Sequence, residues 1–238
     1  MEQARASDRR LRHSMRCGQA YGADVRNMSV GVLYRVGAPL SAVGPCAVAV
    51  AGTREPTPWG RRAARMIGRM LAEAGYATVT GLARGIDEEA ALGALEAGGY
   101  TVAVLPYLLE RCGKLSPRAA WLLRTAASYG APASAVAENL VKDDSRVGMW
   151  LAARNKIIAR IATALIVPEA RLKQTRWGTR HAVERALEAG RLVVVLKPRS
   201  GGGGVAEAFS YFRHRGAVAA EDTDEALDMI KHRCRLPH

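Results

Sequence analysis

Short polar motifs follow the predicted strands of this chain. Gly52-Thr53-Arg54 comes directly after the apolar run Cys46–Ala51, and Gly81-Leu82-Ala83-Arg84-Gly85-Ile86-Asp87 comes after Tyr76–Thr80. Glycine lets a backbone approach a phosphate closely, threonine supplies a short hydroxyl donor, and arginine supplies a planar fork that matches phosphate oxygens. These residue types in this order therefore indicate a site that binds anions.

Related segments recur in the second half of the chain, at Arg154-Asn155-Lys156, Pro168-Glu169-Ala170 and Trp177-Gly178-Thr179. In doubly wound folds, ligands bind at the C-terminal ends of the parallel strands, where helix N-termini offer free amides. The residues that we expect to contact DNA or another phosphate-bearing ligand are Gly52, Thr53, Arg54, Gly81, Arg84, Gly85, Asp87, Arg154, Asn155, Lys156, Glu169, Gly178 and Thr179. We assign no catalytic residue.

Three residues of these motifs have structural interpretations as well. Asp87 is equally suited to cap a helix or to balance its dipole. Asn155 is suited to hold a loop. Trp177 is either a platform on which bases stack or a buried anchor.

The other polar residues give weaker signals. Arg61, Arg65 and Arg69 recur every four residues, and we interpret them as a solvated stripe on one face of a helix. The histidines show neither H-x-x-x-H nor H-E-x-x-H spacing, and no C-x-x-C pair exists, so we expect no metal site. We expect inert thiols in a reducing compartment at Cys17, Cys46, Cys112 and Cys234.

Strand and helix patterns alternate from about residue 30 onward, which predicts a doubly wound, mostly parallel Rossmann-like sheet in an α/β fold. The predicted strands are Cys46–Ala51, Tyr76–Thr80, Tyr100–Leu105, Ala131–Ala137, Ala162–Val167 and Leu192–Leu196. The predicted helices are Arg61–Ala74, Ile86–Leu95, Pro117–Tyr129, Gly148–Ile161, Gly178–Ala189, Val205–His214 and Thr223–Arg233. Arg-rich residues 1–27 form a predicted flexible tail, and residues 28–238 form a single domain.

Charge and hydropathy restrict the class of partner. The chain holds 35 Lys and Arg residues against 22 Asp and Glu residues, a net charge of +13, which favours polyanions such as nucleic acid. A generally cationic surface is the alternative explanation. No run reaches the roughly 18 apolar residues needed to span a bilayer, and the polar N-terminus lacks the features of a secretory signal. We therefore expect a cytoplasmic protein with no membrane partner.

The motifs, taken in order, resemble those of the DNA-processing protein A (DprA or Smf) family, which belongs to the same Rossmann-like superfamily as the LOG nucleotide hydrolases. That family has Gly-Ser-Arg where this chain has Gly52-Thr53-Arg54, and Ser-Gly-x-Ala-x-Gly-Ile-Asp where it has Thr80–Asp87. Its Arg-Asn-Arg-x-Ile resembles Arg154–Ile158. Val167-Pro168-Glu169-Ala170 and Trp177-Gly178-Thr179 also match, and the likeness spans about residues 32–230.

The resemblance implies a non-catalytic protein that binds single-stranded DNA without a cofactor, forms a homodimer and loads a recombinase of the RecA type. Some positions depart from the family pattern, which indicates a divergent branch. Ala91 stands where the family has histidine, Lys156 replaces an arginine, and Trp177 replaces a small residue.

Two alternatives remain. The first is a nucleotide-binding sensor or hydrolase of the LOG type, whose Pro-Gly-Gly-x-Gly-Thr-x-x-Glu signature needs a glutamate where this chain has Ala182. Glu184 lies two residues further on, which turns its side chain by about 200° around a helix. The second alternative is a protein that uses an old nucleotide fold only as an interaction surface.

Overall fold

The computed structural model describes residues 23–24, 33–34, 43–44, 46–105, 117–119, 121–122, 147–172, 178–199 and 202–235. Its main strands are β3 (Ala47–Val50), β4 (Ala77–Thr80), β5 (Thr101–Ala103), β6 (Ala164–Val167), β7 (Leu192–Leu196) and β8 (Val218–Ala220). Its helices include α2 (Pro58–Glu73), α3 (Ile86–Glu96), α5 (Val147–Ile161), α6 (Gly178–Glu188), α7 (Val205–His214) and α8 (Thr223–Arg235).

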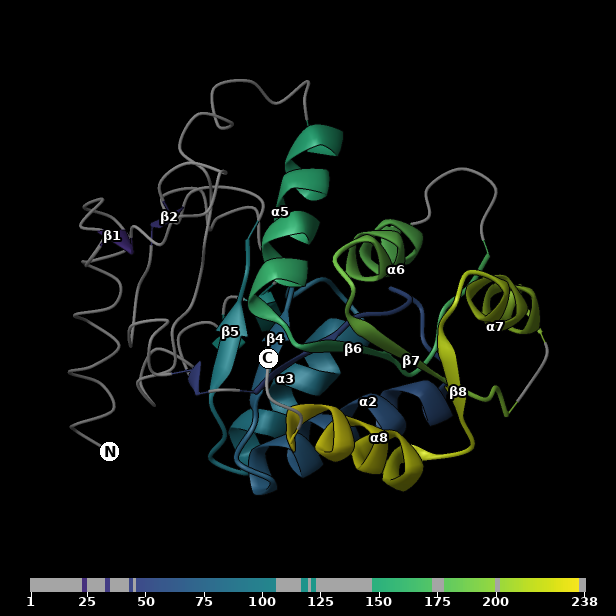
Figure 1. Cartoon of the computed structure of the whole chain (residues 1–238), viewed down its shortest axis with the longest axis horizontal. Helices are drawn as coiled ribbons and strands as arrows, with labels where there is room; N and C mark the ends of the chain where they lie inside the picture. Colours follow the sequence, from purple (N-terminus) through teal and green to yellow (C-terminus); the bar gives the residue numbers. More distant parts are fainter. Residues whose placement is uncertain are drawn as a thin grey trace.

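The six main strands form one sheet between two layers of helices (Figure 1). Their order is β5-β4-β3-β6-β7-β8, and every neighbouring pair is parallel. The chain therefore winds outward in both directions from the centre, and the strand order reverses between β3 and β6. The predicted doubly wound parallel sheet is confirmed.

Both faces of the sheet are apolar because helices cover both of them. Helices α5, α6 and α7 pack on one face through residues such as Ile157, Val183 and Phe212. Helices α2, α3 and α8 pack on the other face, to which α2 contributes Ile67 and α8 contributes Ile230. This arrangement places the first turns of the helices near the C-terminal ends of the strands, where the predicted site residues other than Arg154, Asn155 and Lys156 lie.

Helix α2 begins at Pro58, three residues before the predicted start at Arg61. Thr57 caps the helix, because its hydroxyl accepts a hydrogen bond from the backbone of Gly60 at 3.0 Å. Proline fits the first helical position, which needs no backbone donor. The sequence-based prediction missed this turn because its residues include Pro58 and Gly60, which usually mark a turn.

Two segments differ from the sequence-based expectation. Strand β8 joins the edge of the sheet beside β7, where no strand was predicted, because three residues are too few to show an alternating pattern. Within the predicted tail, Ala23–Asp24 forms β1, which pairs antiparallel with β2 (Leu33–Tyr34). The domain boundary at residue 27 stays a prediction.

Other predictions lie partly or wholly outside the described residues. Residues 117–119 and 121–122 are helical, as predicted for Pro117–Tyr129, and the rest of that helix is not described. The predicted strand Ala131–Ala137 also lies outside the described residues. Within the described part of the chain, no helix is long and apolar enough to cross a membrane, and no group of His, Cys, Asp and Glu is placed to hold a metal ion.

The expectation of inert thiols was wrong for one pair of cysteines. Cys46, at the start of β3, and Cys234, near the end of α8, form a disulfide, and their Cα atoms lie 5.7 Å apart. The pair is 188 residues apart in sequence, so only the packing of α8 beside the start of β3 brings the two sulfurs together. Cys17 and Cys112 lie outside the described residues.

Candidate nucleic-acid interface

The loops after β3, β4 and β6 meet at one edge of the sheet. The backbone N–H of Thr53 donates to the carbonyl of Glu169 at 2.9 Å, and the N–H of Ile86 donates to the carbonyl of Thr53 at 3.2 Å. The loop after β3 is therefore hydrogen-bonded to both of its neighbours. The structure brings together the motifs that the sequence placed at separate strand ends.

Two glycines allow these loops to pack against one another. A Cβ atom on Gly52 would lie 2.5 Å from the carbonyl oxygen of Glu169, and one on Gly85 would lie 2.5 Å from the carbonyl oxygen of Thr53. Gly85 also has a φ of 95°, which side chains other than glycine rarely adopt. Glycine is therefore required at both positions because the loops touch there. The sequence pattern indicated a different reason for these glycines, namely that a phosphate approaches the backbone.

Asp87 closes the loop after β4 from inside the protein. Its buried carboxylate accepts hydrogen bonds from the backbone N–H groups of Gly81 at 3.2 Å and Ala83 at 3.4 Å. Leu82, between them, has a φ of 51° and donates its own N–H to the Thr80 hydroxyl at 3.1 Å, so the amides on either side of it point toward one carboxylate. Burial raises the pKa of the Asp87 carboxyl above its ordinary value, and the charge of Arg154 offsets part of that rise.

The carboxylate of Glu169 likewise binds protein groups, here at the N-terminus of α2. Its carboxylate accepts the backbone N–H of Thr57 at 3.0 Å and the Thr57 hydroxyl at 2.5 Å, and it lies 3.6 Å from Nε of Arg171. The carboxylate is buried, and the positive end of the helix dipole stabilises its charge. The amide of Thr57 and the two amides of the loop after β4 are thus bound to internal carboxylates.

Arg154, Asn155 and Lys156 lie in the middle of α5, away from its ends. Arg154 donates from Nη1 to the carbonyl of Gly81 at 3.0 Å, and its Nε lies 3.4 Å from Oδ1 of the buried Asn155. A Cβ on Gly81 would collide with this guanidinium. Arg154 therefore supports the loop after β4, whereas Lys156 is exposed.

Arg54 and Arg84 differ from these residues because both side chains are exposed. The backbone of Arg54 lies against Gly85, whose added Cβ would be 2.9 Å from the Cα of Arg54, and Arg84 directly precedes Gly85. Two exposed guanidinium groups thus arise from touching segments. At the start of α6, Gly178 is exposed and Thr179 is buried. Trp177 lies outside the described residues.

The arginine stripe of α2 is mainly paired with acidic residues of α3. Arg65 binds Glu96 through two hydrogen bonds, one of them 2.8 Å long, and Arg69 lies 3.9 Å from the same carboxylate. This agrees with the interpretation of a solvated stripe. Arg61 is different, because it shares the buried Glu89 with Arg118, a residue that sequence analysis did not select.

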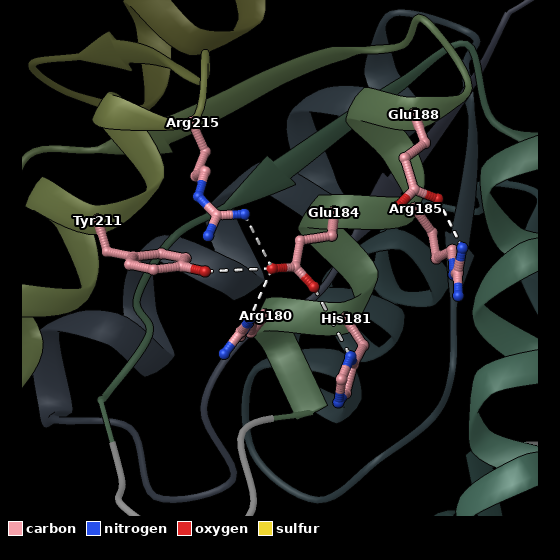
Figure 2. A network of polar contacts seen from close by, with 7 residues as sticks. All are labelled: Arg180, His181, Glu184, Arg185, Glu188, Tyr211 and Arg215. Atoms are coloured by element: carbon pink, nitrogen blue, oxygen red, sulfur yellow. Dashed lines mark hydrogen bonds and ion pairs between the residues drawn. The ribbon is translucent and has the colours of Figure 1, made fainter.

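Glu184 points toward Tyr211 on α7 and toward Arg215, the residue that follows α7 (Figure 2). Its Oε1 accepts hydrogen bonds from Arg180 at 2.8 Å, the Tyr211 hydroxyl at 3.1 Å and Arg215 at 3.3 Å. Burial alone would raise the pKa of Glu184, but these bonds and the charges of the two arginines hold it below its ordinary value. Glu184 is therefore an ionised residue that ties α6 to α7.

Comparison with known proteins supports the family resemblance that these motifs indicated. The model of the family DNA recombination-mediator protein A matches residues 18–231. The chain is 31% identical over 208 residues to a putative DNA processing protein DprA of Mycobacterium tuberculosis, covering 84% of this chain and 49% of the relative. It is 30% identical over 184 residues to protein Smf of Escherichia coli, covering 77% of this chain and 47% of the relative.

The fold is similar to that of DNA processing protein A from Helicobacter pylori, solved in a study of its single-stranded DNA binding mode. The TM-score is 0.69 at 22% identity, over 88% of this chain and 91% of that one. The chain spans about half the length of the curated relatives that it matches. With a family model that covers nearly all of its described residues, the chain belongs to the DNA recombination-mediator protein A (DprA/Smf) family.

Proposed function

We propose that this chain acts in DNA processing by binding single-stranded DNA along the edge of the sheet formed by the loops after β3, β4 and β6, and that it does so without catalysis. The observation that carries the proposal is the position of Arg54 and Arg84. Both are exposed and rise from loops in direct backbone contact. Two exposed guanidinium groups on neighbouring loops suit the phosphates of a flexible strand.

The internal carboxylates favour a strand over a small nucleotide as the ligand. Asp87 and Glu169 already bind amides that would otherwise hold the phosphate of a mononucleotide. An external phosphate must therefore use exposed side chains, each of which supplies modest affinity when solvent screens it. A polymer that contacts several such side chains at once gains the affinity that a mononucleotide lacks.

The net charge of +13 supports the same proposal, because it concentrates polyanions near the surface at low salt. The Helicobacter pylori relative is described as having a single-stranded DNA binding mode. We extend to this chain the binding of single-stranded DNA, a homodimeric state, a cytoplasmic location, where the Cys46–Cys234 disulfide would be an exception to the usual reduced state of thiols, and a partner recombinase of the RecA type. The last three follow from the family resemblance and the sequence pattern.

A titration tests the proposal directly. Fluorescently labelled single-stranded DNA, duplex DNA of the same length and mononucleotides are each titrated with the chain at several salt concentrations. We expect the single strand to bind tightest, with log K falling against log salt by about 0.7 for each phosphate contacted. Binding that ignores salt, a clear preference for duplex, or tight binding of mononucleotides alone would reject the proposal.

A further inference from the structure

Trp121 exposes its side chain to solvent. Its exposure is 47%, whereas Ala119 and Leu122 on the same helical segment are 2% and 1% exposed. Trp59, Tyr76, Tyr100, Phe209, Tyr211 and Phe212 are all buried or half-buried, so Trp121 is the one exposed aromatic side chain among those that the structure describes. The segment therefore docks through its small and apolar residues and leaves a large indole outside.

Ion pairs hold this segment at the same edge of the sheet as the candidate interface. Arg118 lies 3.0 Å from Oε1 of Glu89, and Arg61 lies 3.2 Å from the same atom. Glu89 is in the first turn of α3, directly after the loop that carries Arg84, and Arg61 is in the first turn of α2. Trp121 follows Arg118 by three residues, which makes the two neighbours on a helix surface.

The charges around Trp121 suit a nucleic acid. Two arginines share one buried carboxylate, so the cluster keeps a net positive charge, and the side chains of Arg61 and Arg118 are 42% and 39% exposed. Proteins that bind single strands combine a cationic path for the backbone with aromatic side chains on which bases stack. The exposed indole of Trp121 would be the stacking surface, and the exposed guanidinium groups of Arg61 and Arg118 would be the cationic path.

We propose that Trp121 is a stacking platform for one base of the strand whose phosphates Arg54 and Arg84 bind, with Arg61 and Arg118 beside the phosphates that flank that base. The inference rests on the proposed function, because it needs a single strand at this edge. Its specific content is that binding depends on the bases at this point and not only on the phosphates. It also assigns a DNA contact to a residue outside the motifs at the strand ends.

The test compares two oligonucleotides of equal length and charge, one of thymidines and one of abasic residues. Wild type, Trp121→Ala, Trp121→Phe and Arg54→Ala are titrated against both by fluorescence anisotropy, and thermal melts check folding. Met66→Ala is the matched control, since Met66 is 48% exposed on α2. We expect Trp121→Ala to weaken binding of the thymidine strand by about five-fold or more and to leave the abasic strand unaffected. Trp121→Phe should retain most of the affinity, and Met66→Ala all of it.

Each outcome separates the two proposals. If Arg54→Ala weakens both strands while Trp121→Ala weakens neither, or weakens both equally, the stacking inference fails and the proposed function stands. If wild type binds neither strand at low salt, both fail. If Trp121→Ala leaves DNA affinity unchanged but abolishes self-association in sedimentation, the indole belongs to a contact between copies of the chain, and the stacking inference is overturned.

Discussion

The carboxylate of Glu169 holds both the backbone N–H and the hydroxyl of Thr57, a residue 112 positions earlier in the chain. This contact joins the end of β6 to the start of α2 across the point where the strand order reverses. In an open α/β sheet, ligands enter at that point. Here an internal anion occupies the helix N-terminus, and under the proposed function the exposed side chains around it bind DNA.

Replacing Glu169 by glutamine should therefore act on stability. The uncharged amide loses a charge-assisted acceptor in a buried site, and we expect the free energy of unfolding to fall by about 1–3 kcal/mol in urea titrations. Glu207→Gln, on an exposed position in the first turn of α7, is the control and should change it little. A Glu169→Gln protein that melts normally but binds DNA poorly would instead make Glu169 a DNA contact.

Arg54→Ala and Arg84→Ala should each weaken binding of single-stranded DNA while the fold survives. Losing one charge-assisted contact to a phosphate costs on the order of 1.5–3 kcal/mol, and less where water screens it. The salt slope should become shallower by about one contact. Arg65→Ala removes the same charge from a side chain already paired with Glu96 and is the control. A larger loss for Arg65→Ala than for both others would place DNA across the helical face of α2.

Asp87 should make stability depend on pH in a direction opposite to that of most acids. Because burial raises its pKa in the folded state, the folded protein holds this proton more strongly than the unfolded chain. The stability contributed by this group is thus greatest below the ordinary pKa of about 3.9 and is lost as pH rises through the raised value. Urea titrations of wild type and Asp87→Asn at several pH values should show wild type losing stability relative to the variant as pH rises from acid. An unchanged difference would show that the pKa is not raised.

The chain should not release free base or phosphate from nucleoside monophosphates. Ala182 stands where the hydrolase signature needs glutamate, and the carboxylate of Glu184 is already bound by Arg180, Tyr211 and Arg215. Chromatography of a long incubation with each monophosphate should show only the starting nucleotide. Base release that disappears in Glu184→Gln would contradict this prediction and return the hydrolase alternative.

Reduction of the Cys46–Cys234 disulfide should destabilise the protein. The bond links residues far apart in sequence, and such a cross-link contributes about 2–5 kcal/mol, chiefly by restricting the unfolded chain. Melting with and without a reductant measures the effect. A variant with serine at both positions should melt at one temperature in either condition, whereas a wild type that is equally insensitive would show that the bond does not form.

The sequence alone determined the architecture and the position of the candidate site along the chain. Buried strands read as short apolar runs, helices show a 3.6-residue period, and their alternation requires parallel strands with helices on both faces. The same logic put Gly52-Thr53-Arg54 and Gly81–Asp87 at strand ends, where the structure has them. These features depend on local pattern, which a sequence records directly.

Only the tertiary structure decided what each residue of the motifs does. Arg154 and Glu169 look like ligand contacts in sequence, yet each one binds backbone groups of a distant segment of the chain, and Asp87 binds backbone groups of its own motif. The sequence did not single out Arg118 and Trp121 as site residues, because their place beside α3 depends on the ion pair of Arg118 with Glu89, about 30 positions away. Exposure and partners of a polar side chain arise from contacts between distant segments, and these are not encoded in any local spacing.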